Sequence, residues 1–203
     1  MENTIIAISR QFASGGRLVG KILSEKLGIP FYDKEIIELA AEKSGLSADF
    51  IRNNEEIAKS SFICNMSTSM QQAAGAFFMQ YEMPASDKAF FAQTSIIRDL
   101  ASKGSCVILG RCGGYILREE FNCISVFLHS TLEDRAKRAV EIYKLPEKGI
   151  TDKLLKADKA RMNYHKYYTG ERWTDIHAYD LCINTEKVGI DGAAATILTY
   201  LGK

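Results

Sequence analysis

A serine, two glycines and an arginine cluster directly after a short apolar run. The run Thr4–Ser9 is rich in β-branched residues, and Ser14-Gly15-Gly16-Arg17 follows it. Apolar residues then recur at helical spacing from Leu18 to Leu27. A glycine-rich turn between a strand and a helix presents backbone N–H groups to an anion, and the helix N-terminus adds partial positive charge. The stretch predicts a phosphate-binding loop; the alternative is a tight turn that only packs the strand against the helix.

Arginines and one aspartate follow the other predicted strands. In an open parallel sheet, ligands bind beyond the carboxyl ends of the strands, where this chain has Arg10, Asp33 and Arg111. Arginine offers forked donors that match phosphate oxygens, and it stays charged at any working pH. We expect Arg10, Arg17 and Arg111 to bring three cations to one cleft. The alternatives are a salt bridge at the sheet rim for Arg111 and a helix N-cap for Asp33.

The segment 151–170 has the pattern of a basic helix. Its cations are Lys153, Lys156, Lys159, Arg161 and Lys166. Such a run is either a solvated helix face or a lid whose cations close over transferring phosphates. On the second interpretation, the lid-like segment would span about residues 145–175.

Five strand candidates alternate with helices, which is typical of a parallel sheet covered on both faces. Apolar runs such as Cys106–Leu109 indicate strands buried on both sides. We therefore expect an α/β fold of three layers with a five-stranded parallel sheet. The predicted strands are Thr4–Ser9, Pro30–Tyr32, Ser105–Gly110, Ile124–His129 and Leu181–Asn184.

Three polar residues are candidate helix caps. Asp33 precedes a helix that runs toward Gly45, and Ser130 with Glu133 has the spacing of a capping box for a helix from Leu132. Asp191 precedes a last helix, Gly192–Leu201. The stretch from residue 34 to about residue 100 has no strand signal and predicts a helical insert. Its apolar stripe, at helical steps, is compatible with core packing, a substrate lid or a homodimer surface, and comprises Phe62, Met66, Met70, Ala73, Phe77 and Tyr81.

Composition limits the partners of this chain. Among its 203 residues, 26 Lys and Arg face 25 Asp and Glu, for a net charge of +1. This balance gives no bulk attraction to nucleic acid or to an anionic membrane. The apolar runs are too short to span a bilayer, and no signal segment precedes the first strand, so we expect a cytoplasmic protein. The 5 cysteines and 3 histidines show no metal-ligand spacing, so we expect reduced thiols and no metal-ligating set.

Several longer strings resemble the cytidylate kinase-like family, whose members are relatives of the nucleoside monophosphate kinases. The strings Ile8–Arg17 and Gly28–Glu35 resemble its start, and Val107–Cys112 resembles its third strand and Gly-Arg turn. Residues 158–185 are similar to its C-terminal part. The resemblance covers nearly the whole chain and implies one P-loop kinase-like domain over residues 1–203. Its core would be residues 1–33 and 101–203, with an acceptor-binding insert at about 34–100.

The resemblance also implies roles for the candidate residues. It implies ATP as the phosphoryl donor and leaves the need for Mg²⁺ open. The implied donor-phosphate set is Arg10, Ser14, Gly15, Gly16 and Arg17. The implied acceptor set is Asp33, Arg98 and Arg111. The implied catalytic set is Arg17, Arg111 and Arg161.

The loop departs from the standard phosphate loop, Gly-x4-Gly-Lys-Ser/Thr. With its second glycine on Gly16, Arg17 stands at the lysine and Leu18 at the hydroxyl residue. With it on Gly15, Gly16 stands at the lysine and Arg17 at the hydroxyl residue. Neither register supplies the lysine or the hydroxyl that holds magnesium.

Two functions stay open for this chain. One is an ATP-dependent kinase for a nucleoside monophosphate, CMP first, or a similar phosphorylated acceptor. The other is a non-catalytic sensor of nucleotide or phosphate.

Overall fold

A five-stranded parallel sheet forms the centre of the computed structural model, which describes residues 3–56 and 83–203. The strand order is β2-β3-β1-β4-β5, and every pair in the ladder is parallel. The expected parallel sheet is confirmed, and each predicted strand agrees with an observed one to within one residue at either end. The strands are β1 (Ile5–Arg10), β2 (Phe31–Tyr32), β3 (Cys106–Leu109), β4 (Cys123–His129) and β5 (Leu181–Asn184).

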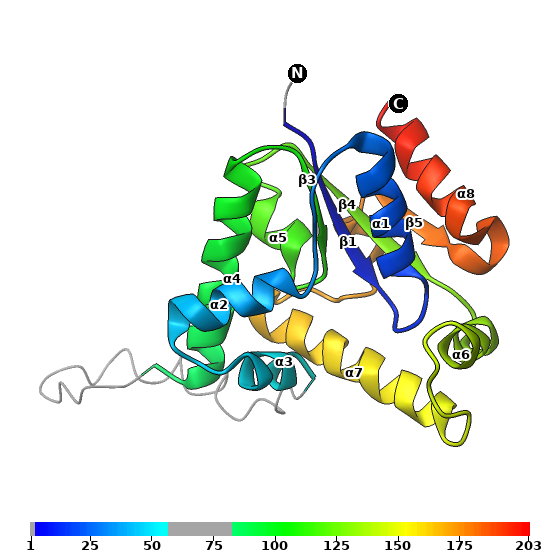
Figure 1. Cartoon of the computed structure of the whole chain (residues 1–203), viewed down its shortest axis with the longest axis horizontal. Coiled ribbons are helices and arrows are strands. Elements are labelled where there is room, and N and C mark those ends of the chain that lie inside the picture. Colours follow the sequence, from blue (N-terminus) through cyan, green and yellow to red (C-terminus); the bar gives the residue numbers. More distant parts are fainter. Residues whose placement is uncertain (1–2, 57–82) are drawn as a thin grey trace, which may run out of the picture.

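Helices cover both faces of this sheet (Figure 1). On one face lie α1 (Gly16–Leu27) and α8 (Thr185–Tyr200), and on the other lie α4 (Ala85–Ser102) and α5 (Gly113–Leu117). Alternate residues of β1 serve the two cores, since Ile6 and Ile8 pack with α1 and α8, while Ile5 packs with α4 and α5. Burial on both sides explains why the strand sequences are continuously apolar.

The carboxyl ends of the strands point toward α7 (Ile150–Thr169), which runs beneath this edge of the sheet (Figure 1). Two further helices, α6 (Leu132–Glu141) and α3 (Ala48–Glu56), contact α7, and α2 (Glu35–Ser44) packs against α3 and α4. The predicted basic helix is present, beginning and ending one residue earlier than expected. It covers the edge at which parallel sheets bind ligands.

All three predicted helix caps are wrong. The N-cap of α2 is Lys34, and the Asp33 side chain pairs with arginines instead. The N-cap of α6 is Thr131, because its hydroxyl accepts the Asp134 N–H. Helix α8 already begins at Thr185, so Asp191 lies inside it, beyond a break at Gly189. In each case a different residue starts the helix, and spacing alone cannot choose between such neighbours.

The cysteines only partly match the expected core thiols. Cys106 and Cys112 are buried, but Cys182 is exposed. Burial raises the pKa of Cys106 to about 11, so this thiol stays protonated near neutral pH. The predicted apolar stripe from Phe62 to Tyr81 lies outside the described residues. Within the described ranges, the helices lack the length and apolar character that crossing a membrane needs.

Candidate phosphate site

The backbone carbonyls of the loop between β1 and α1 are held by side chains from other elements. Arg161 of α7 donates to the Arg10 carbonyl at 2.9 Å, and Arg138 of α6 donates to the Ala13 carbonyl at 2.9 Å. The N–H groups of Gly15, Gly16 and Arg17, by contrast, donate to no acceptor in residues 3–56 and 83–203. These N–H groups stand at the N-terminus of α1, where helices favour anions, although Gly15 and Gly16 themselves are buried.

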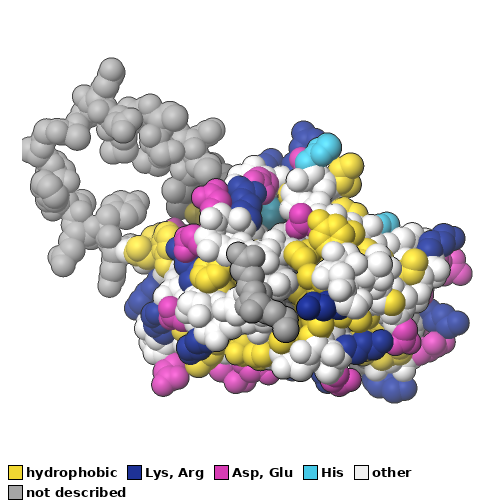
Figure 2. Space-filling model, turned by 90° about the horizontal axis from the view of Figure 1, so that it is seen from above, with side chains coloured by type: hydrophobic (Ala, Val, Ile, Leu, Met, Phe, Trp, Pro, Cys, Tyr) yellow, Lys and Arg dark blue, Asp and Glu magenta, His cyan; other side chains and the backbone are white. Residues whose placement is uncertain are grey.

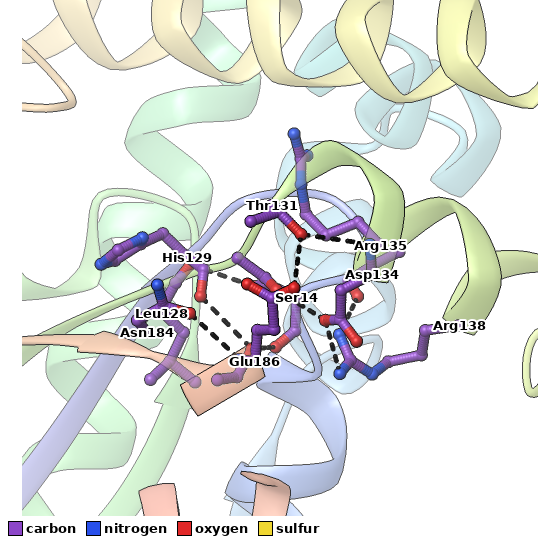
Figure 3. A network of polar contacts seen from close by, with 12 residues as sticks. Ser14, Leu128, His129, Thr131, Asp134, Arg135, Arg138, Asn184 and Glu186 are labelled. Carbon is purple, nitrogen blue, oxygen red and sulfur yellow. Dashed lines mark hydrogen bonds and ion pairs between the residues drawn. The ribbon is translucent and has the colours of Figure 1, made fainter. Parts of the chain in front are cut away.

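Ser14 anchors this loop and does not face an anion site. Its side chain is fully buried, with the hydroxyl 3.0 Å from the carbonyl oxygens of Gln11 and Leu128. The Thr185 hydroxyl donates to the Ser14 carbonyl at 2.9 Å. Figure 3 shows Ser14 between the end of β4, the start of α6 and the start of α8. The predicted phosphate ligand therefore contributes here by fixing the loop.

A cavity of about 610 Å³ lies between the strand ends and α7. Three predicted site residues line it together, namely Arg10, Arg111 and Arg161. Arg17, which we expected in the same cleft, is not among its lining residues. Sequence reasoning missed Arg52 of α3, which also lines it. Lys153 and Lys156, which were expected on either a solvated helix face or a phosphate-covering lid, line it too. The opposite side of the molecule, seen from above in Figure 2, mixes basic and acidic side chains. Positive charge is thus concentrated at the edge of the sheet where a ligand is expected.

One face of α7 forms the long wall of this cavity. The wall residues recur at alternating steps of three and one from Gly149 to His165. At 1.5 Å per residue this face is about 24 Å long. Its N-terminal half carries Lys153 and Lys156, and its C-terminal end carries aromatic rings beside Trp173. The cavity is therefore cationic at one end and aromatic at the other.

Two glycines make room for the side chain of Arg10. A Cβ on Gly110 would lie 1.9 Å from Arg10 Nη1, and one on Gly16 would lie 2.8 Å from Arg10 Cγ. The Arg10 side chain therefore lies across the start of α1 and the end of β3. Any residue larger than glycine at either position would displace this cation.

Asp33 joins two of the predicted arginines. Its carboxylate lies 3.4 Å from Arg17 Nε and 3.6 Å from Arg111 Nη1. Arg111 also donates to the Leu109 carbonyl at 2.9 Å, in a left-handed backbone conformation. We call this group the Arg17–Asp33–Arg111 bridge. It brings three residues from different strand ends together and fixes the direction of a buried guanidinium at the cavity.

Arg98 does not reach this cavity. It forms an ion pair of 2.9 Å with Glu120 on the surface, where about half of its side chain is exposed. Sequence reasoning also missed a buried ion pair that holds the loop. Asp158 of α7 accepts the Phe12 N–H at 2.7 Å and pairs with Arg135 of α6 at 2.5 Å. No periodicity signals such a pair, because both residues lie on helices that read as exposed.

His165 is a second residue that the sequence did not single out. It is buried, lines the cavity, and its Nε2 has no hydrogen-bond partner in the described structure. Burial lowers its pKa, so the ring is neutral at pH 7. A buried polar atom without a partner is costly. His165 thus offers an uncharged hydrogen-bonding group to a ligand at the aromatic end.

The carboxylates around the loop do not fit a protein-held Mg²⁺. Asp33, Asp134 and Asp158 are each paired with arginine. The described residues contain no group of three or more His, Cys, Asp or Glu side chains that could hold a metal ion. Magnesium prefers oxygen ligands in near-octahedral geometry, and these oxygens are already engaged.

Gly15→Ala should destabilise the fold and weaken anion binding. Gly15 has a φ of +89°, and a Cβ there would lie 2.2 Å from Ile190 Cδ1. We expect a loss of about 1–3 kcal/mol in the free energy of unfolding, because strain and overlap add. Urea unfolding and titration with pyrophosphate measure the two effects.

Gly28→Ala is the matched control for this substitution. Gly28 ends the same helix at a φ of +65°, with nothing within 4 Å of its Cβ position. It should cost only the backbone strain and leave pyrophosphate affinity unchanged. Equal costs for the two variants would contradict the packing of Ile190 on the loop.

Comparisons with known proteins agree with this architecture. The model of the Cytidylate kinase-like family matches residues 5–187. A cytidylate kinase from Sulfurisphaera tokodaii is 25% identical over 198 residues, which are 97% of this chain and 94% of that protein. The structure of an uncharacterized protein from Eubacterium ventriosum is 31% identical, with a TM-score of 0.70 over 98% of this chain and 99% of the other.

A more distant neighbour is the shikimate kinase from Acinetobacter baumannii, solved in complex with shikimate. It is 16% identical, with a TM-score of 0.52 over 99% of this chain and 93% of that one. At this identity the likeness concerns the fold alone. It confirms the expected kinase-like α/β fold.

Proposed function

Because the chain belongs to the cytidylate kinase-like family, we propose that it transfers the γ-phosphoryl group of ATP to a nucleoside monophosphate, with CMP as the first candidate. The observation that carries this proposal is the cationic cavity beside the loop. Its lining combines Arg10, Arg111 and Arg161 with three further cations. Such a concentration suits two phosphorylated ligands that must be held close together.

The donor phosphates would lie at the N-terminus of α1. The N–H groups of Gly15, Gly16 and Arg17 have no acceptor there within the described residues, and helix N-termini favour anions. Arg17 would supply the charge that a lysine supplies in the standard loop. Ser14 supports this arrangement from behind, because its carbonyl and hydroxyl are bonded within the fold.

The acceptor phosphate would bind Arg111. This guanidinium is oriented by Asp33 and by the Leu109 carbonyl. An oxygen of the acceptor phosphate attacks the γ-phosphorus in line, and the bond to the β–γ bridging oxygen breaks. The electron pair leaves with ADP. No general base is needed, because the attacking oxygen is already anionic at neutral pH, and Arg161 would neutralise charge from the side of α7.

The base and sugar of the acceptor would occupy the aromatic end of the cavity. Tyr164 and His165 lie there, about one helical turn beyond Arg161 on α7, and Trp173 also lines the cavity. A neutral His165 can form a hydrogen bond to a sugar hydroxyl or a base edge. This end offers aromatic surface on which the base of a nucleotide can pack, which a cleft that binds only phosphate does not need.

A non-catalytic sensor is the second candidate, and two observations favour it. The Arg10 side chain lies against Gly16, and Ile190 lies against Gly15, so the start of α1 is partly covered. The chain also has no lysine or hydroxyl residue in register after the glycines. A protein that only reports bound phosphate needs neither group.

Product analysis with a panel of acceptors separates the two candidates. The protein is incubated with ATP and each nucleoside monophosphate in turn, and diphosphates are measured by anion-exchange chromatography. Formation of CDP above the other diphosphates supports the proposal. Calorimetric binding of ATP or CMP without any diphosphate product across the panel would overturn it in favour of the sensor.

A further inference from the structure

We infer that this site neutralises bound phosphates with arginines and lysines, so that a nucleotide diphosphate binds at least as tightly without Mg²⁺ as with it. The inference rests on the part of the proposed function that puts nucleotide phosphates at the loop. It concerns affinity, and it is independent of whether phosphoryl transfer follows. Four features of the described residues carry it.

The first feature is the chemistry at the start of α1. Position 17 is an arginine and position 18 is a leucine. Neither side chain carries an oxygen, so the first turn of the helix offers no side-chain ligand to a magnesium ion. Ser14, the nearest hydroxyl, is fully buried and lies 3.0 Å from two carbonyl oxygens. It faces into the fold, away from the end of the helix.

The second feature is the engagement of the surrounding carboxylates. Asp33 lies between two guanidinium groups, and Asp158 accepts from Arg135 and from the Phe12 N–H. Glu35 accepts the Asp33 N–H at 3.0 Å. At Asp33 or Asp158 a metal ion would have to displace an arginine and then stand beside it, and at Glu35 it would have to displace a backbone N–H. These changes oppose binding, and at the two aspartates like charges at short distance also repel.

The third feature is the number of cations that face the ligand. Arg10, Arg52, Arg111, Lys153, Lys156 and Arg161 line the cavity, and the only carboxylate among its lining residues in the described structure is Asp152. Each cation forms a stronger bond with a fully charged phosphate than with one already paired with magnesium. Free nucleotide therefore gains more from this lining than its magnesium complex does.

The fourth feature is the role that the bridge leaves for Asp33. An acid at the end of β2 is a candidate metal ligand by position. Here it lies 3.4 Å from Arg17 and 3.6 Å from Arg111, so in this structure it pairs with both guanidinium groups and fixes their positions. When the charge of Asp33 is removed, the two roles predict different changes in nucleotide affinity with and without Mg²⁺.

The experiment titrates the intact protein with ADP, and separately with inorganic pyrophosphate, by calorimetry at constant ionic strength. One series contains EDTA and the other contains excess Mg²⁺. We expect the Kd in EDTA to be equal to, or about two- to tenfold lower than, the Kd in Mg²⁺. Tightening by Mg²⁺ of about twofold or more would overturn the inference.

The variant Asp33→Asn distinguishes a residue that positions arginines from a residue that binds a metal ion. If Asp33 positions arginines, the substitution changes affinity by the same factor in EDTA and in Mg²⁺. A loss confined to the Mg²⁺ series would identify a metal ligand and overturn the inference. Asp99→Asn is the matched control, since Asp99 is exposed and pairs with Lys43 on the surface. It should change neither series.

The outcomes also separate this inference from the proposed function. Metal-independent binding without product overturns the kinase and leaves the inference standing. Product formation with binding that requires Mg²⁺ does the reverse. If neither ADP nor pyrophosphate binds under either condition, both fall together.

Discussion

Arg111→Ala should lower kcat/KM for the acceptor nucleotide by about 100- to 1,000-fold. Arg111 is the most buried of the three predicted catalytic arginines, with 4% of its side chain exposed, and it lines the cavity. Removing it takes away a forked donor that Asp33 and the Leu109 carbonyl orient toward the cavity. Steady-state kinetics with varied CMP and saturating ATP give the measurement.

Two further variants test whether the loss comes from the forked guanidinium of Arg111 and whether it is specific to this arginine. Arg111→Lys keeps the charge but loses the fork, so it should recover only part of the activity. Arg98→Ala should change kcat/KM little, because Arg98 pairs with Glu120 on the surface, outside the cavity. If Arg98→Ala loses activity to a similar extent while Arg111→Ala stays near wild type, Arg98 and not Arg111 binds the acceptor.

The loss in Arg111→Ala has to be separated from a loss of folding. The substitution leaves the Leu109 carbonyl without its donor and reduces the bridge around Asp33 to one partner. Thermal unfolding of the variant is therefore measured beside the kinetics. Arg111→Lys again helps, because it can keep a donor near both oxygens while losing the geometry that two phosphate oxygens require.

The sheet and its loop are the features that the sequence predicts well. The β-branched run of β1, the glycines at 15 and 16 and the shift to helical spacing depend on local physics. All five strands and the basic helix α7 follow from such patterns. The same argument brings Arg10 and Arg111 to one edge, because parallel strands end on the same side.

Contacts between distant segments are what the sequence could not supply. Ser14 reads as a phosphate ligand by its place in the loop, but Leu128 and Thr185 engage its oxygens from more than 110 residues away. The family resemblance implies that Arg98 binds the acceptor, but in the structure Arg98 pairs with Glu120 on the surface. Helix caps failed for the same reason, because several polar residues compete within a few positions and packing decides between them.

Asp158→Leu should lower the free energy of unfolding by about 3–5 kcal/mol, which is more than we expect for Gly15→Ala. It leaves Arg135 buried without its partner and the Phe12 N–H without its acceptor at 2.7 Å. Phe12 belongs to the loop, so pyrophosphate affinity should fall as well. Urea unfolding and calorimetry measure the two effects.

A double variant tests whether the cost comes from the unpaired charge. Arg135→Met combined with Asp158→Leu removes both charges from a buried setting, so it should be more stable than Asp158→Leu alone. Affinity for pyrophosphate should stay low in the double variant, because the Phe12 N–H still lacks its acceptor. Stability thus recovers while pyrophosphate affinity does not, if the pair holds the loop in place.

The pair between Arg118 and Glu171 is the control for this cycle. Its atoms are 2.7 Å apart, close to the 2.5 Å of the buried pair, but 42% and 32% of the two side chains are exposed. Glu171→Leu should therefore cost less than about 1 kcal/mol. If it costs as much as Asp158→Leu, burial is not the source of the effect. If Asp158→Leu leaves pyrophosphate affinity intact, α7 does not position the loop.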